Sequence, residues 1–289
     1  MTETRATDYR DIPGWFNPID HRLFTGLLSN QASTPPGDLV EIGVFMGKSA
    51  VVIGDHLRPD ERFVALDLFG DLSLLGEDPQ ARTNKTENQK SYARLTRERF
   101  EQHYLSVHDS LPDVVQAPSD TVMDHVEERS VRLVHVDASH LYDPVAEDCR
   151  SVKKMLRPGG VAAFDDWRNG KCPGVAAAIW ESVVRDGLVP VATTNNKLYA
   201  AHEGAEDVLA SVRRVIDAEP EWWLVEEHLI MGHTVLRLAS VAAEARRRAA
   251  KARDQHSSSP APAGAGRATA VRRIGARLRS TARSLTGGS

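Results

Sequence analysis

The fold is decided by the stretch Asp38-Leu-Val-Glu-Ile-Gly-Val-Phe-Met-Gly-Lys-Ser49. Its first five residues form a short, mainly apolar run, which predicts a strand, and Gly43 follows at once, which predicts a sharp turn. Residues 48–57 then have a helical pattern that ends before Arg58-Pro59. A strand, a tight turn and a helix in direct succession indicate the start of a βαβ unit and therefore a parallel sheet.

The same alternation continues along the chain. Apolar runs that predict strands fall at residues 62–67, 113–116, 131–137, 161–165, 189–193 and 233–238. Helical patterns fall at residues 91–104, 145–156, 174–186 and 207–218. Strands that alternate with helices predict an α/β protein whose sheet is covered on both faces. The polar residues 70–90 lack a clear periodicity, and a segment of that length is typical of a lid or binding loop.

The composition is that of an ordinary water-soluble protein, with 41% hydrophobic and 26% charged residues among 289. No apolar run reaches the roughly 18 residues that a membrane-spanning helix needs. The polar residues 1–11 argue against a secretory signal, and Cys149 and Cys172 are too few for a disulfide framework. We therefore expect a cytoplasmic, reducing location.

The net charge of −4 conceals a strong asymmetry. Residues 241–289 contain 11 Lys/Arg and 2 Asp/Glu, a net of +9, which leaves −13 on residues 1–240. We expect the folded domain to end at residue 240 and the rest to be a disordered or partly helical tail, with residues 257–266 as a flexible linker. An alternative role for the tail is a peripheral contact with an anionic surface. The apolar residues that share one helical face among its arginines are Val271, Ile274, Leu278 and Leu285.

The carboxyl ends of the first three predicted strands carry residues suited to a nucleotide-like ligand. The first strand leads into Glu41-x-Gly43-x-x-x-Gly47, which differs from the Gly-x-Gly-x-x-Gly spacing of dinucleotide sites. Asp67 ends the second strand, where a carboxylate can bind ribose hydroxyls, although a helix cap or turn is an equally good interpretation. Ser119 follows the third strand, where a hydroxyl can reach an adenine edge.

The segment from Glu41 to Ser49, together with Asp67 and Ser119, resembles the cofactor motifs of class I S-adenosylmethionine-dependent methyltransferases. The resemblance implies a Rossmann-like, doubly wound and mostly parallel sheet of seven strands with an antiparallel last strand. It also implies that S-adenosylmethionine is the cofactor, with its methionine part at the two glycines, its ribose at Asp67 and its adenine at Ser119. The predicted cofactor residues are Glu41, Gly43, Gly47, Ser49, Asp67, Ser119 and Asp137.

Acidic residues end the next two predicted strands. Asp137 closes one of them, and Asp165-Asp166 closes the other, 28 residues later. Because neighbouring parallel strands end side by side, these three carboxylates are expected to converge, and their mutual repulsion raises their pKa values. A hard divalent cation such as Mg²⁺ relieves that repulsion. The alternative is that Asp137 is a cap and that the acidic pair belongs to a polar turn.

His140 is the candidate base, since it lies three residues after Asp137 and has an ordinary pKa of about 6.5. The pattern Asp137-x-x-His140, followed by Asp165-Asp166, resembles the macrocin and mycinamicin sugar O-methyltransferases and the bacterial metal-dependent O-methyltransferase family around them. This resemblance covers about residues 12–200. It implies that the three aspartates bind magnesium and that a hydroxyl of a sugar, glycan or glycosylated natural product is methylated. Some relatives have glutamate where this chain has Asp165, which leaves the metal preference open.

Four residues are candidates for contacts with the acceptor: Trp15, Tyr142, Trp167 and Arg168. Trp15 belongs to an expected N-terminal flap or helix over residues 1–35, and residues 70–92 are the expected lid. His135 lies in an apolar strand and is expected to be a core histidine. A homodimer is expected from the family resemblance.

Two other functions compete with methyl transfer. A nicotinamide-dependent oxidoreductase uses a similar sheet, but the spacing around Gly43 and the three aspartates count against it. A nucleic-acid- or polyanion-binding protein acting through the arginine-rich tail is the second alternative. The net charge of −13 on residues 1–240 opposes a broad nucleic-acid footprint, so nucleic acid is not an expected partner.

Overall fold

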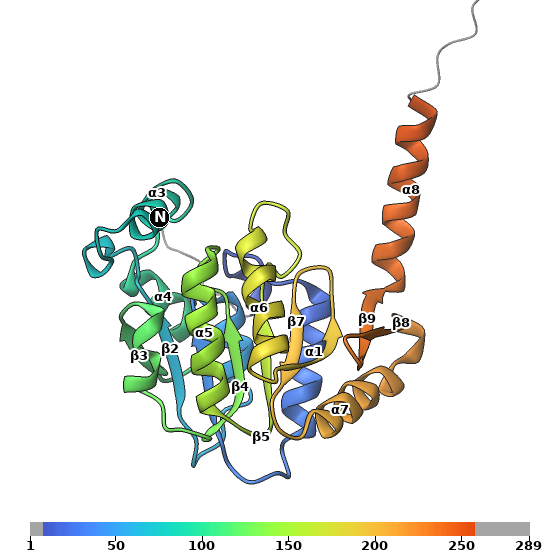
Figure 1. Ribbon diagram of the computed structural model, residues 1–289, viewed down its shortest axis with the longest axis horizontal. Helices are drawn as coiled ribbons and strands as arrows, with labels where there is room; N and C mark the ends of the chain where they lie inside the picture. Colours follow the sequence, from blue (N-terminus) through green and yellow to red (C-terminus); the bar gives the residue numbers. More distant parts are fainter. Residues whose placement is uncertain (1–7, 258–289) are drawn as a thin grey trace, which may run out of the picture. The chain divides into compact units, whose positions relative to one another are not determined.

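The protein is built around one large sheet. The computed structural model describes residues 8–257 and contains a nine-stranded sheet in the order β3-β2-β1-β4-β5-β7-β6-β9-β8 (Figure 1). Strands β3, β2, β1, β4 and β5 are parallel, and β7 is antiparallel to both of its neighbours, β5 and β6. The fold class is therefore the expected Rossmann-like α/β class. The strands are β1 (Asp38–Ile42), β2 (Phe63–Asp67), β3 (Asp113–Gln116), β4 (Val131–Val136), β5 (Leu156–Phe164), β6 (Val189–Thr193), β7 (Leu198–Ala201), β8 (Trp223–Ile230) and β9 (His233–Ser240).

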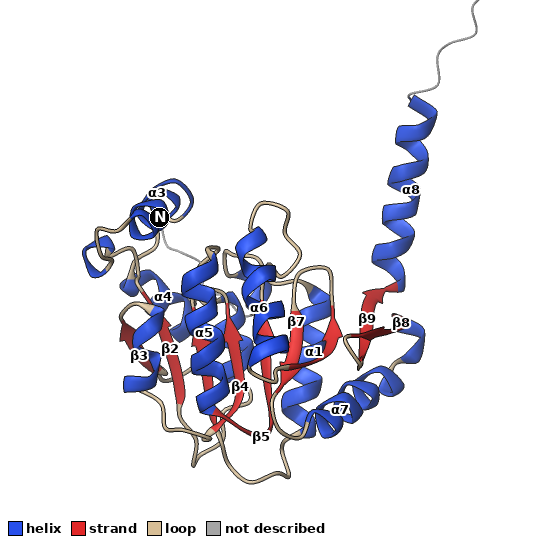
Figure 2. Cartoon of the chain, viewed as in Figure 1, coloured by secondary structure: helices blue, strands red, loops and turns tan. Residues whose placement is uncertain are grey.

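Helices cover both faces of the sheet (Figure 2). Helices α1, α2, α4 and α7 contribute to one hydrophobic core, and α5 and α6 contribute to the other. Leu39 of β1 faces the first core and Val40 faces the second, so the parallel strands are apolar on both sides. The helices are α1 (Pro18–Asn30), α2 (Lys48–Gly54), α3 (Pro79–Ser91), α4 (Arg97–Leu105), α5 (Tyr142–Met155), α6 (Pro173–Arg185), α7 (Ala205–Ala218) and α8 (Val241–Ser257).

The sheet has nine strands rather than the expected seven, because β7 and β8 were not predicted. β7 has only four residues, too few for a period to be recognised, and β8 is exposed at most positions and therefore lacks the apolar alternation of a half-buried strand. The predicted last strand, β9, is parallel to β6 and antiparallel to β8. The antiparallel strand next to β5 is β7.

The predicted lid contains a helix of its own. Asp78 accepts hydrogen bonds from the backbone of Gln80 and Ala81, and Pro79 occupies the first helical position, so α3 begins at a well-formed cap. The helix is almost entirely polar, which explains why no apolar periodicity revealed it. The expected helix over residues 91–104 begins later, as α4, after the Thr96 side chain caps Arg99.

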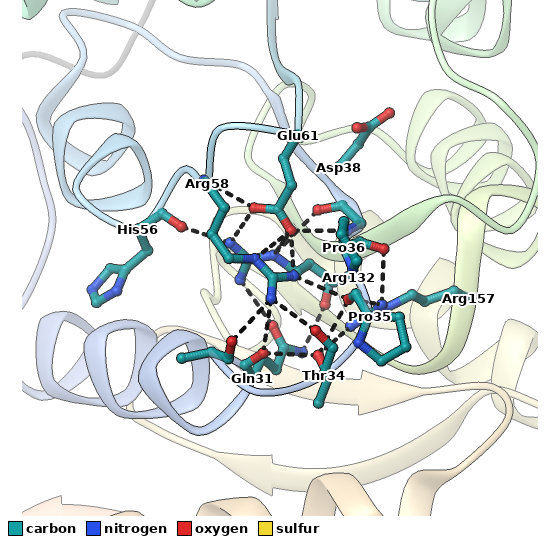
Figure 3. Close-up of polar contacts among 12 residues, drawn as sticks. Gln31, Thr34, Pro35, Pro36, Asp38, His56, Arg58, Glu61, Arg132 and Arg157 are labelled. Atoms are coloured by element: carbon teal, nitrogen blue, oxygen red, sulfur yellow. Dashed lines mark hydrogen bonds and ion pairs between the residues drawn. The ribbon is translucent and has the colours of Figure 1, made fainter.

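A buried ion-pair network fastens the amino ends of the strands, opposite to the carboxyl ends (Figure 3). The side chain of Arg132 is 1% exposed and donates to both oxygens of Glu61 at 2.8 Å. Burial opposes ionisation of Glu61, but hydrogen bonds from Arg132 and Arg58 prevail and lower its pKa to about 2. Arg58 and Arg157 also donate to backbone carbonyls of the loop before β1, including that of Pro35. The network therefore sets where β1 begins.

The part of the chain after the sheet begins with α8, and the compact unit that contains the sheet ends within this helix, at Arg246. The predicted linker after Ser257 and the predicted amphipathic segment from Val271 to Leu285 lie outside the described residues. Among residues 8–257, no helix combines the length and the apolar character that crossing a bilayer requires.

Candidate active site

A cavity of about 1130 Å³ opens at the carboxyl ends of the parallel strands, where α/β sheets of this kind bind ligands. Helix α3 contributes Asn84, Glu87 and Asn88 to its wall, so the predicted lid borders the cavity. The predicted site residues that line it are Trp15, Gly43, Asp67, Ser119, Asp137, His140, Asp165 and Asp166. Residues expected to bind cofactor, to bind metal and to act as base thus share one cavity.

The turn after β1 is shaped by Gly43, which has φ +86°. A Cβ atom at Gly43 would lie 2.3 Å from the carbonyl oxygen of Asp137, so only glycine lets the loops after β1 and β4 approach this closely. Phe45 also has a positive φ, of 49°, which is uncommon for a residue with a side chain. Gly47 caps α2 with φ +90° and, unlike Gly43, does not line the cavity.

Asp67, at the end of β2, holds this turn in place. One carboxylate oxygen accepts from the backbone N–H groups of Val44 at 2.8 Å and Phe45 at 3.0 Å, and the other accepts from Phe69 at 2.8 Å. Burial raises the pKa of Asp67, although these three hydrogen bonds oppose the shift. Asp67 therefore acts as a turn residue and also lines the cavity at the position predicted for ribose.

Ser119 begins a short 3₁₀ helix after β3 and lines the cavity beside Pro118. Behind it, on α5, lies Asp148, which is 0% exposed. Neither oxygen of Asp148 has a well-formed hydrogen bond among the described residues. Burial raises the pKa of Asp148 to about 7, the Ser119 hydroxyl opposes this shift, and Asp120 and Glu147 add to it.

A buried chain of polar side chains runs beneath the cavity. Ser49 donates to Glu41, whose Oε1 lies 2.7 Å from His135 Nδ1 on the neighbouring strand β4. His135 Nε2 lies 2.7 Å from the ammonium group of Lys197, and that ammonium donates to Asp165 Oδ2 at 2.5 Å. His135 is buried in the core, as predicted, and each of its two ring nitrogens contacts a polar side chain. Glu41 and Ser49, which were predicted to bind the cofactor, belong instead to this row of connected side chains and do not line the cavity.

The charge states of these connected polar side chains depend on burial and on Lys197, which is 1% exposed. Burial raises the pKa of Glu41 to about 8, against the opposing effects of the Ser49 hydrogen bond and the charge of Lys197. Burial also acts to raise the pKa of Asp165, but the ammonium of Lys197 outweighs it and lowers that pKa. Lys197 is therefore an internal cation for the acidic end of the cavity.

The three predicted metal ligands are divided between two groups. Asp137 and Asp165 offer oxygen atoms within 4.8 Å of each other and of His135, whereas Asp166 groups with His140 and Cys172. Burial raises the pKa of Asp137 well above its ordinary value, and the charge of Asp165 adds to the effect. Partly buried carboxylates that repel each other are the donor set that a divalent cation stabilises, so these residues fit a metal ion bound through oxygen.

His140 lies between two carboxylates. Its Nδ1 is 2.5 Å from Glu87 of α3, and its Nε2 is 3.0 Å from Asp166. The hydrogen bond to Asp166, followed by that to Glu87, raises the pKa of His140 to about 9 against the effect of burial. The imidazole is therefore cationic at neutral pH in this arrangement, and it accepts a proton only after Asp166 is engaged elsewhere.

Only one of the four predicted acceptor residues lines the cavity. Trp15 is 74% exposed and stacks on Phe45 with ring centroids 5.4 Å apart. Tyr142 instead donates to Glu181, and Trp167 packs edge to face against Trp180. Arg168 is exposed beside Trp167 and also lies outside the cavity lining.

Three functional candidates were not found from the sequence: Glu87, Asp148 and Lys197. Glu87 lies in the polar lid, where no pattern distinguishes one acid from another. Asp148 lies on the apolar face of α5, and an acid at a buried helical position was the available signal. Lys197 follows β6 in a turn and becomes significant only through its contacts with β4 and β5.

Comparison with known proteins shows what the sheet and its cavity are similar to. Residues 40–167 match a family model described as a methyltransferase domain. Among the solved structures that are similar, three each align with about two thirds of this chain. The O-methyltransferase NovP has 18% identity, with 64% of this chain and 80% of NovP covered and a TM-score of 0.51. The TDP-rhamnose 3'-O-methyltransferase CalS11 of calicheamicin biosynthesis has 18% identity, covers 64% and 80% of the two chains, and has a TM-score of 0.41. The mycinamycin-pathway methyltransferase MycE has 15% identity, covers 65% and 50%, and has a TM-score of 0.39.

The matched segment runs from within β1 to just after β5 and contains the cavity residues Gly43, Asp67 and Ser119, so this part of the chain is a methyltransferase domain, in agreement with the resemblance seen in the sequence. The likeness to NovP independently supports the fold. No curated protein matches the chain. Three residues of the cofactor motif line the same cavity: Gly43, whose missing side chain lets the loops after β1 and β4 meet, Asp67 and Ser119.

Proposed function

We propose that this methyltransferase acts on oxygen, uses a divalent metal ion, and methylates a hydroxyl of a sugar, a glycan or a glycosylated natural product. The observation that carries the proposal is the sharing of one cavity by two sets of residues. Gly43, Asp67 and Ser119 form the cofactor side, and the acidic residues with His140 form the other side. Methyl transfer needs little more from the protein than alignment of donor and acceptor and removal of one proton.

Asp137, Asp165 and Asp166 are the residues that would hold the metal ion. Their oxygen donors suit Mg²⁺ or Mn²⁺. When bound, such an ion lowers the pKa of a hydroxyl group that it contacts. Lys197 contributes by compensating part of the negative charge at Asp165, so the carboxylates are held close together before the ion arrives.

His140 is the proposed base, and its Nε2 is the atom that accepts the proton. Glu87 accepts from Nδ1 and so fixes the ring with Nε2 directed to the cavity. If Asp166 held a metal ion, its carboxylate would offer less negative charge to His140 Nε2, and the pKa of His140 would be lower, with Glu87 still raising it in part. The hydroxyl oxygen takes the methyl group from the sulfonium, its proton goes to Nε2, and S-adenosylhomocysteine leaves.

Trp15 is the proposed contact for the acceptor ring. Its exposed face lies at the cavity wall and is supported from behind by Phe45, which itself contacts Tyr92 edge to face at 5.6 Å. A flat aromatic face of this kind suits the apolar face of a sugar or a planar natural product.

The test is a mass-spectrometric screen in which the full-length protein and S-adenosylmethionine are incubated with a panel of glycosides. The expected result is an acceptor that gains one methyl group, with product lost in EDTA and restored by Mg²⁺ or Mn²⁺. Asp166→Asn is expected to remove nearly all turnover, whereas Asp217→Asn, an exposed acid on α7, is expected to leave it unchanged. Full turnover of the wild-type protein in EDTA would refute the metal requirement, and methylation of amines alone would refute the O-methyl specificity.

We also propose a reducing, cytoplasmic setting, which is supported by two buried and unpaired cysteines, Cys149 and Cys172. A homodimer and a peripheral contact between the basic tail and anionic surfaces remain proposals that follow from the sequence. Light scattering of the full chain tests the first. Vesicle sedimentation with and without anionic lipid tests the second.

A further inference from the structure

A second cavity, of about 530 Å³, lies beside the first. Its wall comes from Pro13, from the residues after Gly43, from the end of α3 with the segment that joins it to α4, and from α4 itself. The lining residues are Pro13, Phe45, Met46, Lys90, Tyr92, Ala93, Arg94, Arg99, Gln102 and His103. Phe45 and Tyr92 line both cavities, so the two cavities adjoin at this aromatic pair.

The second cavity is strongly basic. Lys90, Arg94 and Arg99 contribute three positive charges, and no lining residue is acidic. This composition is unusual for a domain whose residues 1–240 carry a net charge of −13. Gln102 and His103 add further groups capable of donating hydrogen bonds.

The three cations have no carboxylate partner among residues 8–257. Arg99 donates to the backbone carbonyl of Arg94 at 3.3 Å, and this is the polar contact found for its guanidinium in the described part of the chain. Their neighbour Arg97 differs, since it pairs with Glu101 at 2.7 Å. Unpaired guanidinium and ammonium groups that converge on a hollow suit a phosphate group, which accepts several charge-assisted hydrogen bonds at once.

We propose that Lys90, Arg94 and Arg99 bind a phosphate or diphosphate group of the acceptor, which is therefore a phosphorylated or nucleotide-linked sugar. This inference rests on the proposed function, because it places the sugar in the first cavity near His140 and the anionic group beyond Phe45 and Tyr92. It predicts that the enzyme acts on the activated sugar before the sugar is transferred to another molecule.

Binding of inorganic pyrophosphate tests the subsite directly, by calorimetry on the full-length protein with S-adenosylhomocysteine and EDTA present. The variant is Arg94→Gln/Arg99→Gln. The control is Arg82→Gln/Arg214→Gln, which removes the same charge from exposed positions outside both cavities. All proteins retain the basic tail, so binding there is common to them. We expect the variant to bind pyrophosphate at least about 10-fold more weakly than the wild-type protein and the control.

Turnover separates an acceptor subsite from a site for a free anion. With a nucleoside diphosphate sugar, the variant is expected to have a raised KM and a nearly unchanged kcat, and the neutral methyl glycoside of the same sugar is expected to be a poor acceptor. Equal pyrophosphate affinity in the variant and the control would overturn the subsite. Weaker binding of S-adenosylhomocysteine by the variant, or a preference for the neutral glycoside, would overturn its assignment to the acceptor. Absence of methyl transfer to every acceptor would refute the proposed function but would leave the pyrophosphate result intact.

Discussion

Replacement of Asp148 by asparagine is expected to stabilise the protein in a pH-dependent way. Asp148 is fully buried behind Ser119, and its carboxyl lacks a well-formed hydrogen bond among the described residues. Burial raises its pKa to about 7, whereas in the unfolded chain an aspartate titrates near about 3.9. Between these values the unfolded chain has lost the proton and the folded chain has kept it. Unfolding therefore releases a proton, and stability falls as pH rises.

The size of the effect follows from the two pKa values. Each pH unit between them costs about 1.4 kcal/mol, and the loss levels off above a pH of about 7. Between pH 5 and pH 8 the wild-type protein is thus expected to lose about 3 kcal/mol through Asp148. Asparagine has nearly the same shape and does not titrate, so the variant lacks this loss. Other buried acids titrate equally in both proteins and cancel in the difference.

Urea unfolding followed by tryptophan fluorescence at pH 5 and pH 8 measures this difference. We expect the free energy of unfolding of Asp148→Asn, relative to wild type, to increase by about 3 kcal/mol between the two pH values, which corresponds to about 6–12 °C in Tm. Asp217→Asn, on the exposed side of α7, serves as the control and is expected to change by less than about 0.5 kcal/mol. The same relative stability at both pH values would refute the reasoning, because it would mean that Asp148 is ionised in the folded protein.

Three further predictions concern the cavity. Lys197→Met leaves the Asp165 carboxylate without its cation and is expected to lower the free energy of unfolding by about 3–5 kcal/mol. The control Lys154→Met, at an exposed position, is expected to lower it by less than about 0.5 kcal/mol. Equal losses for the two variants in urea unfolding would contradict the role of Lys197 as an internal cation. Asp67→Ala removes three backbone contacts at the turn and is expected to weaken S-adenosylhomocysteine binding about 10-fold or more in calorimetry. An unchanged affinity would remove that residue from the cofactor site. His140→Ala is expected to lower turnover by about 10²–10⁴-fold with cofactor affinity unchanged, and wild-type turnover would leave it a structural role.

The local sequence determined much of the architecture. Parallel strands buried on both faces must be apolar throughout, and glycine or proline turns end them, so β1 to β6 and most helices could be predicted. β7 and β8 could not, because one is very short and the other is exposed. Helix α3 was also missed, because it has a capping residue at its start but no apolar face that a periodic pattern could reveal.

The residue types at the strand ends also followed from the sequence, since the carboxyl ends of parallel strands share one edge of the sheet. Gly43, Asp67, Asp137 and His140 were predicted on that basis and line the same cavity. The division of the acidic residues between Lys197 and His140 was decided by tertiary structure alone. A contact between residues 32 positions apart, such as Lys197 with Asp165, leaves no periodic trace in the sequence. The direction of a side chain, its burial and its pKa depend on how the chain packs. The pairing of Lys197 with Asp165 and of His140 with Asp166 could therefore be found only in the folded structure.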